Sequence, residues 1–166
     1  MRTELATRRL VIGPWRDEDL DNYAAMVRER DRRTAAAVQG ELTRDELLAR
    51  IRQQQTAVAD TGIGLLTVRV DDAFAGYCGL VVGRCTLDEP ELAFEFLRAY
   101  HGNGYATEAA RVIVAAAADT GRSRLWATVR PWNHPSLRVL DKLAFERTAK
   151  ITTDDFGDVL WLTRTL

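Results

Sequence analysis

The sequence predicts a mixed α/β fold built around a single sheet, and three observations carry that prediction. The chain has 166 residues, 46% hydrophobic and 28% charged, which suits one globular domain spanning 1–166. Strand-like and helix-like patterns mix along its whole length. A helix-like stretch at 106–119 also connects two strand-like runs, 91–97 and 124–129, and such a connection favours a parallel strand pair.

The first predicted elements are a strand and a helix. Residues 7–12 have a strand pattern that Gly13-Pro14 ends. Asp17 can cap the helix that follows, because apolar residues then recur at helical spacing: Leu20, Tyr23, Ala24 and Val27. Residues 28–33 are rich in arginine but contain two acids, which indicates a solvated helix end. Residues 31–42 lack a clear period and predict a loop or a broken helix.

A second helix and a hairpin complete the N-terminal half. Residues 43–46, Thr-Arg-Asp-Glu, form a capping box, and Leu47, Leu48, Ile51 and Gln55 continue an amphipathic helix to about residue 60. Gly62-Ile63-Gly64 ends this region. Residues 65–70 and 74–82 then predict a hairpin around Asp71-Asp72.

The C-terminal half alternates strands and helices. A strand at 91–97 follows a polar loop, and the helix at 106–119 follows a glycine turn. Residues 124–129 are apolar on both sides of the pleat, which predicts a buried strand. Residues 133–143 predict a helix with Pro135 in its first turn. Residues 145–152 and 159–166 predict closing strands around a turn at 154–157.

Composition excludes several classes of function. The net charge is −1 and the isoelectric point about 6.1, so no basic field favours nucleic acid or an anionic membrane. The N-terminus lacks the apolar run of a signal peptide, and no segment has the roughly 20 apolar residues of a membrane span. Cys78, Cys85, His101 and His134 do not have metal-ligand spacing, so we expect no metal. Cys78 lies in an apolar strand pattern and predicts a small core residue. We expect a cytoplasmic protein.

The glycine turn at 98–109 is the most informative segment. The first turn of a helix has unpaired N–H groups and the positive end of the helix dipole, so a strand, glycine turn and helix together can bind an anion. Gly102 and Gly104 carry no Cβ, and a phosphate could approach their backbone closely. The alternative is a tight turn that merely begins a helix.

Three segments of the chain resemble the motifs of one family. Residues 7–10, Thr-Arg-Arg-Leu, are similar to its opening strand, and residues 102–109 to its acetyl-CoA pyrophosphate loop. Residues 133–145 are similar to its Asn-x-x-Ser helix and the Leu-Gly-Phe that follows. Their order and spacing resemble the GCN5-related N-acetyltransferases (GNAT), specifically the RimJ/RimL-type ribosomal-protein N-terminal acetyltransferases. Two positions depart from the pattern: Ala144 replaces a usual glycine, and His101 a usual glutamine or arginine.

The resemblance implies the GNAT fold, a central and mostly antiparallel sheet with one splayed parallel pair and about four flanking helices. It implies acetyl-CoA as co-substrate, with its pantetheine arm between strands 91–97 and 124–129 and its pyrophosphate at the helix near Gly104. The expected cofactor-binding residues are Phe96, Leu97, His101, Gly102, Asn103, Gly104, Tyr105, Ala106, Thr107, Asn133 and Ser136. The contact at His101 would come from backbone or from a neutral imidazole.

The resemblance also suggests catalytic residues. Glu91 is the expected base, and Glu95, on the same face of the strand, binds the amine or takes the base's place. Ser136 is the expected acid toward the CoA thiolate. The alternatives are that Glu91 lies idle at the wet end of its strand, that Ser136 satisfies a backbone N–H, and that Asn133 caps its helix. Tyr105 and Trp132 could simply pack, and Glu108 could be a first-turn carboxylate favoured by the dipole.

The leading hypothesis is an acetyl-CoA-dependent N-acetyltransferase acting on a primary amine, either a peptide N-terminus or a small molecule, as a monomer or a homodimer. The acceptor pocket should come from Trp15, residues 31–42 and 43–60, and the final hairpin. The alternative is a catalytically silent acyl-CoA-binding or sensing module. A nucleotide-binding domain is disfavoured, because no Lys-Ser/Thr follows the glycines.

Overall fold

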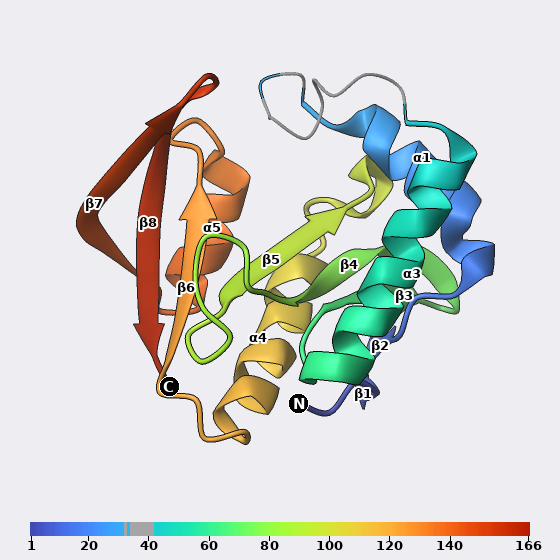
Figure 1. Cartoon of the computed structure of the whole chain (residues 1–166), viewed down its shortest axis with the longest axis horizontal. Helices are drawn as coiled ribbons and strands as arrows, with labels where there is room; N and C mark the ends of the chain where they lie inside the picture. The colour runs from blue at the N-terminus through green and yellow to red at the C-terminus, as the bar shows by residue number, and fades with distance from the viewer. Residues whose placement is uncertain (32, 34–41) are drawn as a thin grey trace.

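The computed structural model describes residues 1–31, 33 and 42–166, whose eight strands form one sheet in the order β1-β2-β3-β4-β5-β6-β8-β7 (Figure 1). The strands are β1 (Leu5–Ala6), β2 (Val11–Gly13), β3 (Leu65–Val70), β4 (Ala73–Val81), β5 (Glu91–Phe96), β6 (Arg124–Val129), β7 (Glu146–Asp154) and β8 (Gly157–Thr165). The helices described are α1 (Leu20–Glu29), α3 (Arg44–Thr61), α4 (Tyr105–Ala118) and α5 (His134–Lys142), with short 3-10 turns at Asp17–Asp19 and Arg98–Tyr100.

Strands β5 and β6 form the parallel pair, and every other neighbouring pair in the sheet is antiparallel. They are in register at one position, Glu91 opposite Trp126, where the Trp126 N–H donates to the Pro90 carbonyl at 2.9 Å. Beyond this point the two strands diverge toward their C-terminal ends (Figure 1). The predicted mixed sheet with one splayed parallel pair is therefore confirmed.

Helices cover both faces of the sheet. Figure 1 shows α1 and α3 in front of the sheet and α4 and α5 behind it. Behind the sheet, the apolar side of α4, including Ala109, Ala110 and Ile113, belongs to the main hydrophobic core. In front, a second cluster joins Trp15 and Phe74 to residues of α1 and α3. Helix α4 contacts β5 and helix α5 contacts β6, so the splay between these strands has helices behind it, whereas α3 and α1 contact β3 and β4.

Most of the predicted elements are confirmed by their local contacts. The Thr43 hydroxyl accepts the Glu46 N–H at 3.3 Å and the Glu46 carboxylate accepts the Thr43 N–H at 2.8 Å, which completes the capping box. Asp71 and Asp72 have φ values of 48° and 63°, as a two-residue hairpin turn requires. Asn133 caps α5, whose first turn contains Pro135. Cys78 is fully buried in the main core, as predicted.

The predicted strand at 7–12 is wrong over residues 7–10 and confirmed at Val11 and Ile12. The Thr7 hydroxyl accepts the N–H groups of Arg9 at 3.2 Å and Leu10 at 2.9 Å, which turns the chain. Residues 7–10 therefore form a tight turn between β1 and β2, which pair antiparallel, whereas Val11 and Ile12 lie in β2. The strand pattern failed here because a local hydrogen bond from a threonine side chain competes with the sheet ladder.

Three further expectations are corrected. Asp17 does not cap α1; its carboxylate accepts from Arg52 at 2.9 Å, and Asp19 accepts the Arg16 N–H instead, at 2.9 Å. Strand β6 is fully buried on one face only, because Trp126 and Thr128 lie on its half-buried face. Arg30, in the stretch expected to be solvated, has only 9% of its side chain exposed. Most of the predicted loop or broken helix at 31–42 lies outside the described residues.

Candidate functional site

The glycine turn before α4 presents a row of backbone donors. Gly102 and Gly104 both have φ of +80°, a conformation that a side chain would strain. Among the described residues, none accepts a hydrogen bond from the backbone N–H groups of residues 102–107. These groups lie at the N-terminus of a 14-residue helix, where the dipole is positive. The turn therefore has the geometry of an anion site.

The N-terminal segment holds this turn in place. Arg9 donates to the Asn103 carbonyl at 3.1 Å and to the Glu108 carboxylate at 2.6 and 2.8 Å. The Thr7 hydroxyl donates to the same carboxylate at 2.5 Å. Burial alone would raise the pKa of Glu108, but the hydrogen bonds from Thr7 and Arg9 outweigh it and lower that pKa. Glu108, expected only as a first-turn carboxylate, therefore anchors the turn, a role that its distance of about 100 residues from Arg9 concealed.

His101 turns back onto β5 rather than out to the anion site. Its Nε2 lies 2.9 Å from the Phe96 carbonyl oxygen, and a carbonyl can only accept, so Nε2 carries the proton. The Asn103 amide donates to the His101 carbonyl at 3.1 Å and closes the turn. The His101 and Asn103 side chains therefore stabilise the turn itself, and the backbone N–H groups of the turn remain available to a ligand.

Backbone groups of β5 face the splay without a partner strand. The Leu97 N–H donates to the Ala75 carbonyl of β4 at 2.9 Å. Because alternate residues of a strand bond to opposite sides, Phe94 and Phe96 direct their N–H and carbonyl groups toward β6. β6 pairs with β5 only near Glu91, so these groups lie in the open part of the fork, where the Phe96 carbonyl already accepts from His101 Nε2. They can pair with an extended ligand that contains amides.

The α5 residues lie on the other side of the fork, directly after β6. Asn133 accepts the Ser136 N–H at 3.2 Å, so Asn133 is the helix cap. The half-buried Ser136 makes no side-chain hydrogen bond with the residues that the structure describes. Its hydroxyl is therefore not used by the helix and is available to a ligand.

The other predicted cofactor contacts lie around the glycine turn. Thr107 is buried in the first turn of α4, whereas Tyr105 and Ala106 are half-buried beside it. The Arg9 guanidinium lies over the Tyr105 ring, 4.7 Å from its centroid. Phe96 is in the main core, and Leu97 packs against the front cluster. Trp132 is covered by the Arg33 guanidinium at 4.0 Å.

Glu91 sits at the closed end of the splay and is only 8% exposed. Its Oε1 accepts the Thr128 N–H at 3.1 Å and also the Thr128 hydroxyl, so it ties β5 to β6. Its Oε2 has one weak contact, the Arg84 N–H at 3.5 Å. A Cβ on Gly83 would lie 2.6 Å from Oε2, so the glycine leaves room for this atom. No ion pair to Glu91 occurs within the described part of the chain.

Glu95 is fully engaged instead. Arg30 donates to both carboxylate oxygens at 2.7–3.0 Å, and the Tyr77 hydroxyl donates at 2.7 Å. Burial works against the charge of Arg30, yet the hydrogen bonds and charge of Glu95 outweigh it and raise the Arg30 pKa. Burial and the Glu95 charge raise the pKa of Tyr77, which keeps its proton and donates it to the carboxylate. Sequence patterns gave no sign of this triad, since Arg30 and Glu95 are 65 residues apart.

Neither cysteine is activated. Burial, and secondarily the Glu91 charge, raises the pKa of Cys85 to about 11, and burial also raises the pKa of Cys78. Both are thiols at neutral pH. The described residues contain no cluster of three or more His, Cys, Asp or Glu side chains that could hold a metal. No described helix is long and apolar enough to cross a membrane.

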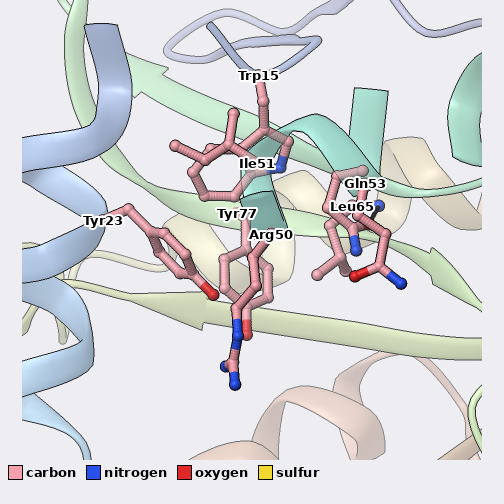
Figure 2. Close-up of a pocket in the computed structure, with 8 residues that line it drawn as sticks. Trp15, Tyr23, Arg50, Ile51, Gln53, Leu65 and Tyr77 are labelled. Atoms are coloured by element: carbon pink, nitrogen blue, oxygen red, sulfur yellow. Dashed lines mark hydrogen bonds between the residues drawn. The ribbon is translucent and has the colours of Figure 1, made fainter. Parts of the chain in front are cut away.

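A pocket of about 340 Å³ lies in front of the sheet, between α3 and strands β3 and β4; we call it the Trp15 pocket (Figure 2). Its apolar and aromatic lining is Trp15, Tyr23, Ile51, Leu65 and Tyr77, and its polar lining is Arg50, Gln53 and Gln54. Trp15 and the 43–60 helix were expected to form the acceptor pocket. The final hairpin, also expected there, does not line this pocket, whereas Tyr23, Leu65 and Tyr77, which were not expected, do.

Known proteins resemble this chain in sequence and architecture. Residues 9–146 match the family model described as "Acetyltransferase (GNAT) domain". No curated protein matches the sequence. A protein from Bordetella pertussis assigned to the GnaT acetyltransferase family is 28% identical, with a TM-score of 0.81 over 98% of this chain and 99% of that one.

Two more distant structures share the fold. An acetyltransferase from Agrobacterium tumefaciens is 23% identical, with a TM-score of 0.79 over 99% of this chain and 95% of that one. RimJ of Mycobacterium smegmatis, solved with a CoA-disulfide, is 18% identical, with a TM-score of 0.73 over 94% of this chain and 81% of that one. At such identities the likeness concerns the fold.

Proposed function

The chain belongs to the GNAT acetyltransferase family, and from this premise we propose that it is an acetyl-CoA-dependent N-acetyltransferase that acts on a primary amine. One observation carries the proposal: an anion-binding turn opens directly onto a parallel strand pair that has separated. A diphosphate linked to an extended, amide-containing arm fits both features. The solved relative with a CoA-disulfide supports this choice of ligand.

Each part of acetyl-CoA has matching groups in the site. The N–H groups of residues 102–107 would bind the pyrophosphate, held there by the Arg9 and Glu108 contacts. The backbone groups of Phe94 and the Phe96 N–H, which have no partner strand, would bond the pantetheine amides, and Asn133 would help to order them. The arm would thus fill the fork as a partial strand. Its thioester would then lie between β5 and α5.

The chemistry proposed is direct transfer between the two bound substrates. The amine nitrogen attacks the thioester carbonyl carbon, an N–C bond forms, and the C–S bond breaks. The amine loses a proton to a base, and the leaving CoA thiolate gains one from the Ser136 hydroxyl, which recovers it from solvent. Because the protein holds both reactants in place, most of the rate gain would come from positioning.

We propose Glu91 Oε2 as the atom that receives the amine proton, directly or through water. Glu95 is neutralised by Arg30 and accepts a hydrogen bond from Tyr77, and a proton would have to displace those contacts. Glu91 has hydrogen bonds from neutral donors only, and they fall mainly on Oε1. Glu95 would instead act as a positioning residue that fixes Arg30 and Tyr77 at the front of the sheet.

An acyl-enzyme route is disfavoured by the cysteines. A thiol must be a thiolate to attack a thioester, and the Cys85 pKa of about 11 keeps it protonated at neutral pH. The proposal places the reaction in the cytoplasm, a reducing compartment in which both thiols persist. The acceptor is either a protein N-terminus, as for the RimJ/RimL-type enzymes, or a small amine.

Two measurements test this proposal together. Calorimetric titration with acetyl-CoA should show binding, and a thiol-release assay with small amines and N-terminal peptides should show turnover. Binding without thiol release from any acceptor would favour the alternative, a catalytically silent acyl-CoA-binding or sensing module. Absence of binding would remove the whole proposal.

A further inference from the structure

A pocket of about 420 Å³ lies behind the sheet, and we call it the rear pocket. It lies between the C-terminal half of α4 and the residues that follow α5, near the C-terminus marked in Figure 1. Its basic lining is Arg111 of α4, Lys142 at the end of α5 and Arg164 of β8. Pockets that hold small molecules in proteins have volumes of about 300–1,000 Å³, so a ligand has room here.

The rear pocket is separate from the proposed acetyl-CoA site. The anion-binding turn is at the N-terminus of α4, whereas the pocket residues of this helix begin at Arg111 and end at Ala118. Ala115 in the pocket wall is eleven residues beyond Gly104, which is about 16 Å along the helix axis. The residues proposed to bind acetyl-CoA, all within the described part of the chain, do not line the pocket. The rear pocket is therefore a distinct site.

The three cations of the rear pocket have no carboxylate partner. Within the part of the chain that the structure describes, none of them forms an ion pair, and no aspartate or glutamate lines the pocket. Arg111 and Lys142 are exposed, and their side chains make no hydrogen bond with the described residues. Arg164 is half-buried and uses one of its five guanidinium N–H groups to donate to the Leu143 carbonyl. Donors and positive charge therefore remain available to a ligand.

The dipoles of the neighbouring helices offset only part of this charge. Ala118 and Lys142, which line the pocket, are the last residues of α4 and α5, and the negative end of a helix dipole favours a cation. Each dipole end is equivalent to about half a unit charge, so the two ends together offset about one cation of the three. A carboxylate at Leu166 would offset one more and would still leave the pocket positive. The surplus charge therefore favours an anion.

The wall beside these cations is apolar. Ala115, Ala118 and Ala144 are exposed and Leu166 is half-buried, so all four side chains can contact a ligand. They lie over Leu143, which is buried in the main hydrophobic core. A ligand that is only a small ion would leave this apolar wall in water, whereas an apolar group on the ligand would cover it.

From this arrangement we infer that the rear pocket binds an organic anion, a carboxylate or phosphate group on an apolar body. Arg111, Lys142 and Arg164 would hold the anionic group, because a guanidinium binds carboxylate or phosphate oxygens in pairs and a lysine adds a point charge. The apolar body would lie on the alanines of α4 and on Leu166. The inference does not depend on the proposed function, because the pocket shares no residue with the acetyl-CoA site.

Matched compounds test the inference by calorimetric titration. para-Toluate and para-toluamide have the same ring and differ in charge, and para-tolyl phosphate carries a phosphate instead. We expect at least one of the two anions to bind roughly ten- to hundredfold more tightly than the amide, as for hydrogen bonds to a charged group. The tighter anion identifies the anionic group. Acetate, which lacks the ring, should bind about tenfold more weakly than para-toluate. No advantage of either anion over the amide, or of para-toluate over acetate, would overturn the inference.

Variants assign the binding to the rear pocket. Arg111→Met and Lys142→Met each remove an exposed side chain that makes no hydrogen bond with the described residues, so both variants should fold. Each should bind the tighter anion about tenfold more weakly than the wild type. Arg28→Met is the matched control, because Arg28 is also an exposed arginine of a helix but lies on α1, in front of the sheet, and its affinity should not change. An unchanged affinity in both pocket variants would overturn the inference.

Further measurements separate the rear pocket from the proposed function and from other occupants. The tighter anion should bind equally well with and without saturating acetyl-CoA, and mutually exclusive binding would overturn the inference. If this anion binds and acetyl-CoA does not, the proposed function fails and the rear pocket remains. If amines are acetylated and neither anion binds, the rear-pocket inference fails alone. A dimer in analytical ultracentrifugation that Arg111→Met dissociates would show a second copy in the pocket, which would also overturn the inference.

Discussion

The carboxylate of Glu91 on β5 accepts hydrogen bonds from both the backbone N–H and the hydroxyl of Thr128 on β6, at the single point where the parallel strands meet. The same side chain therefore ties the closed end of the fork, and its second oxygen lies beside Gly83 and Arg84 in the loop after β4. This contact connects the fold to the proposed chemistry, because one oxygen holds the strands and the other remains available to accept a proton.

Glu91→Gln should lower turnover most near neutral pH, with recovery at high pH. The amide keeps the shape of the side chain but cannot take a proton, whereas alkali supplies free amine. Rescue should be greatest for an alkyl amine, with a pKa of about 10.4, and smaller for a peptide N-terminus, at about 7.7–8.0. The pH profile of kcat/KM with each acceptor measures this.

Glu95→Gln is the control for that profile. Removing one partner of the Arg30 pair should lower the free energy of unfolding by about 2 kcal/mol or more, because Arg30 would be left buried. We expect no rescue by alkali. If Glu95→Gln shows the larger, alkali-rescued loss and Glu91→Gln behaves like the wild type, the two roles are reversed.

Gly104→Val should abolish detectable acetyl-CoA binding in a protein that remains folded. Valine at φ of +80° would strain the turn by at least about 1–2 kcal/mol and would place a side chain where the pyrophosphate must approach. Gly121→Val is the matched control, since Gly121 has the same φ but lies beyond the C-terminus of α4. Calorimetry that shows equal affinity in both variants would remove the phosphate-loop assignment.

The sequence could predict the fold where a local pattern determines it. The capping box at Thr43 and the hairpin turn at Asp71-Asp72 depend on neighbouring residues, and both are confirmed. The strand prediction failed at Thr7 because the hydroxyl of this residue bonds to a backbone N–H three residues on and turns the chain. A strand pattern does not reveal such a bond. The conformation of the glycine turn was predictable, because it depends on residue type, and its role as a ligand site stays a prediction.

The rest of the site depends on contacts between distant segments. Arg30 belongs to a charged run that is typical of a solvent-exposed segment. Its side chain is nevertheless buried, because it donates to Glu95, which also accepts from Tyr77. The same holds for Arg9 with Glu108, because nothing within the N-terminal segment indicates which carboxylate it will meet. Ala144 is a different case. Its φ of +56° is a conformation that suits the glycine usual at this position, so the alanine introduces local backbone strain but loses no contact.

Ser136→Ala should retain acetyl-CoA affinity and lose turnover by roughly ten- to a thousandfold, the range for a positioned proton donor. The stability of α5 should not change, because the Asn133 side chain rather than the Ser136 side chain caps this helix. Calorimetry and thiol release on one preparation give both values. Full turnover in this variant would leave the serine without a catalytic role.

Cys85 should react slowly with iodoacetamide at neutral pH, and the rate should rise about tenfold per pH unit. With a pKa of about 11, roughly one thiol in a thousand is a thiolate at pH 8. Cys85→Ser should retain turnover, because direct transfer needs no thiolate. Rapid labelling at pH 7 together with loss of turnover in Cys85→Ser would instead indicate an acyl-enzyme.

The most direct test of the central claim follows the acetyl group itself. Acetyl-CoA with a deuterated acetyl group is incubated with the protein and a set of primary amines, and mass spectrometry of acceptor and protein is recorded through the first turnover. We predict that the labelled acetyl group appears on the amine nitrogen as free CoA is released, with none attached to the protein. Labelled protein, or intact acetyl-CoA in the presence of every amine, would contradict direct N-acetyl transfer.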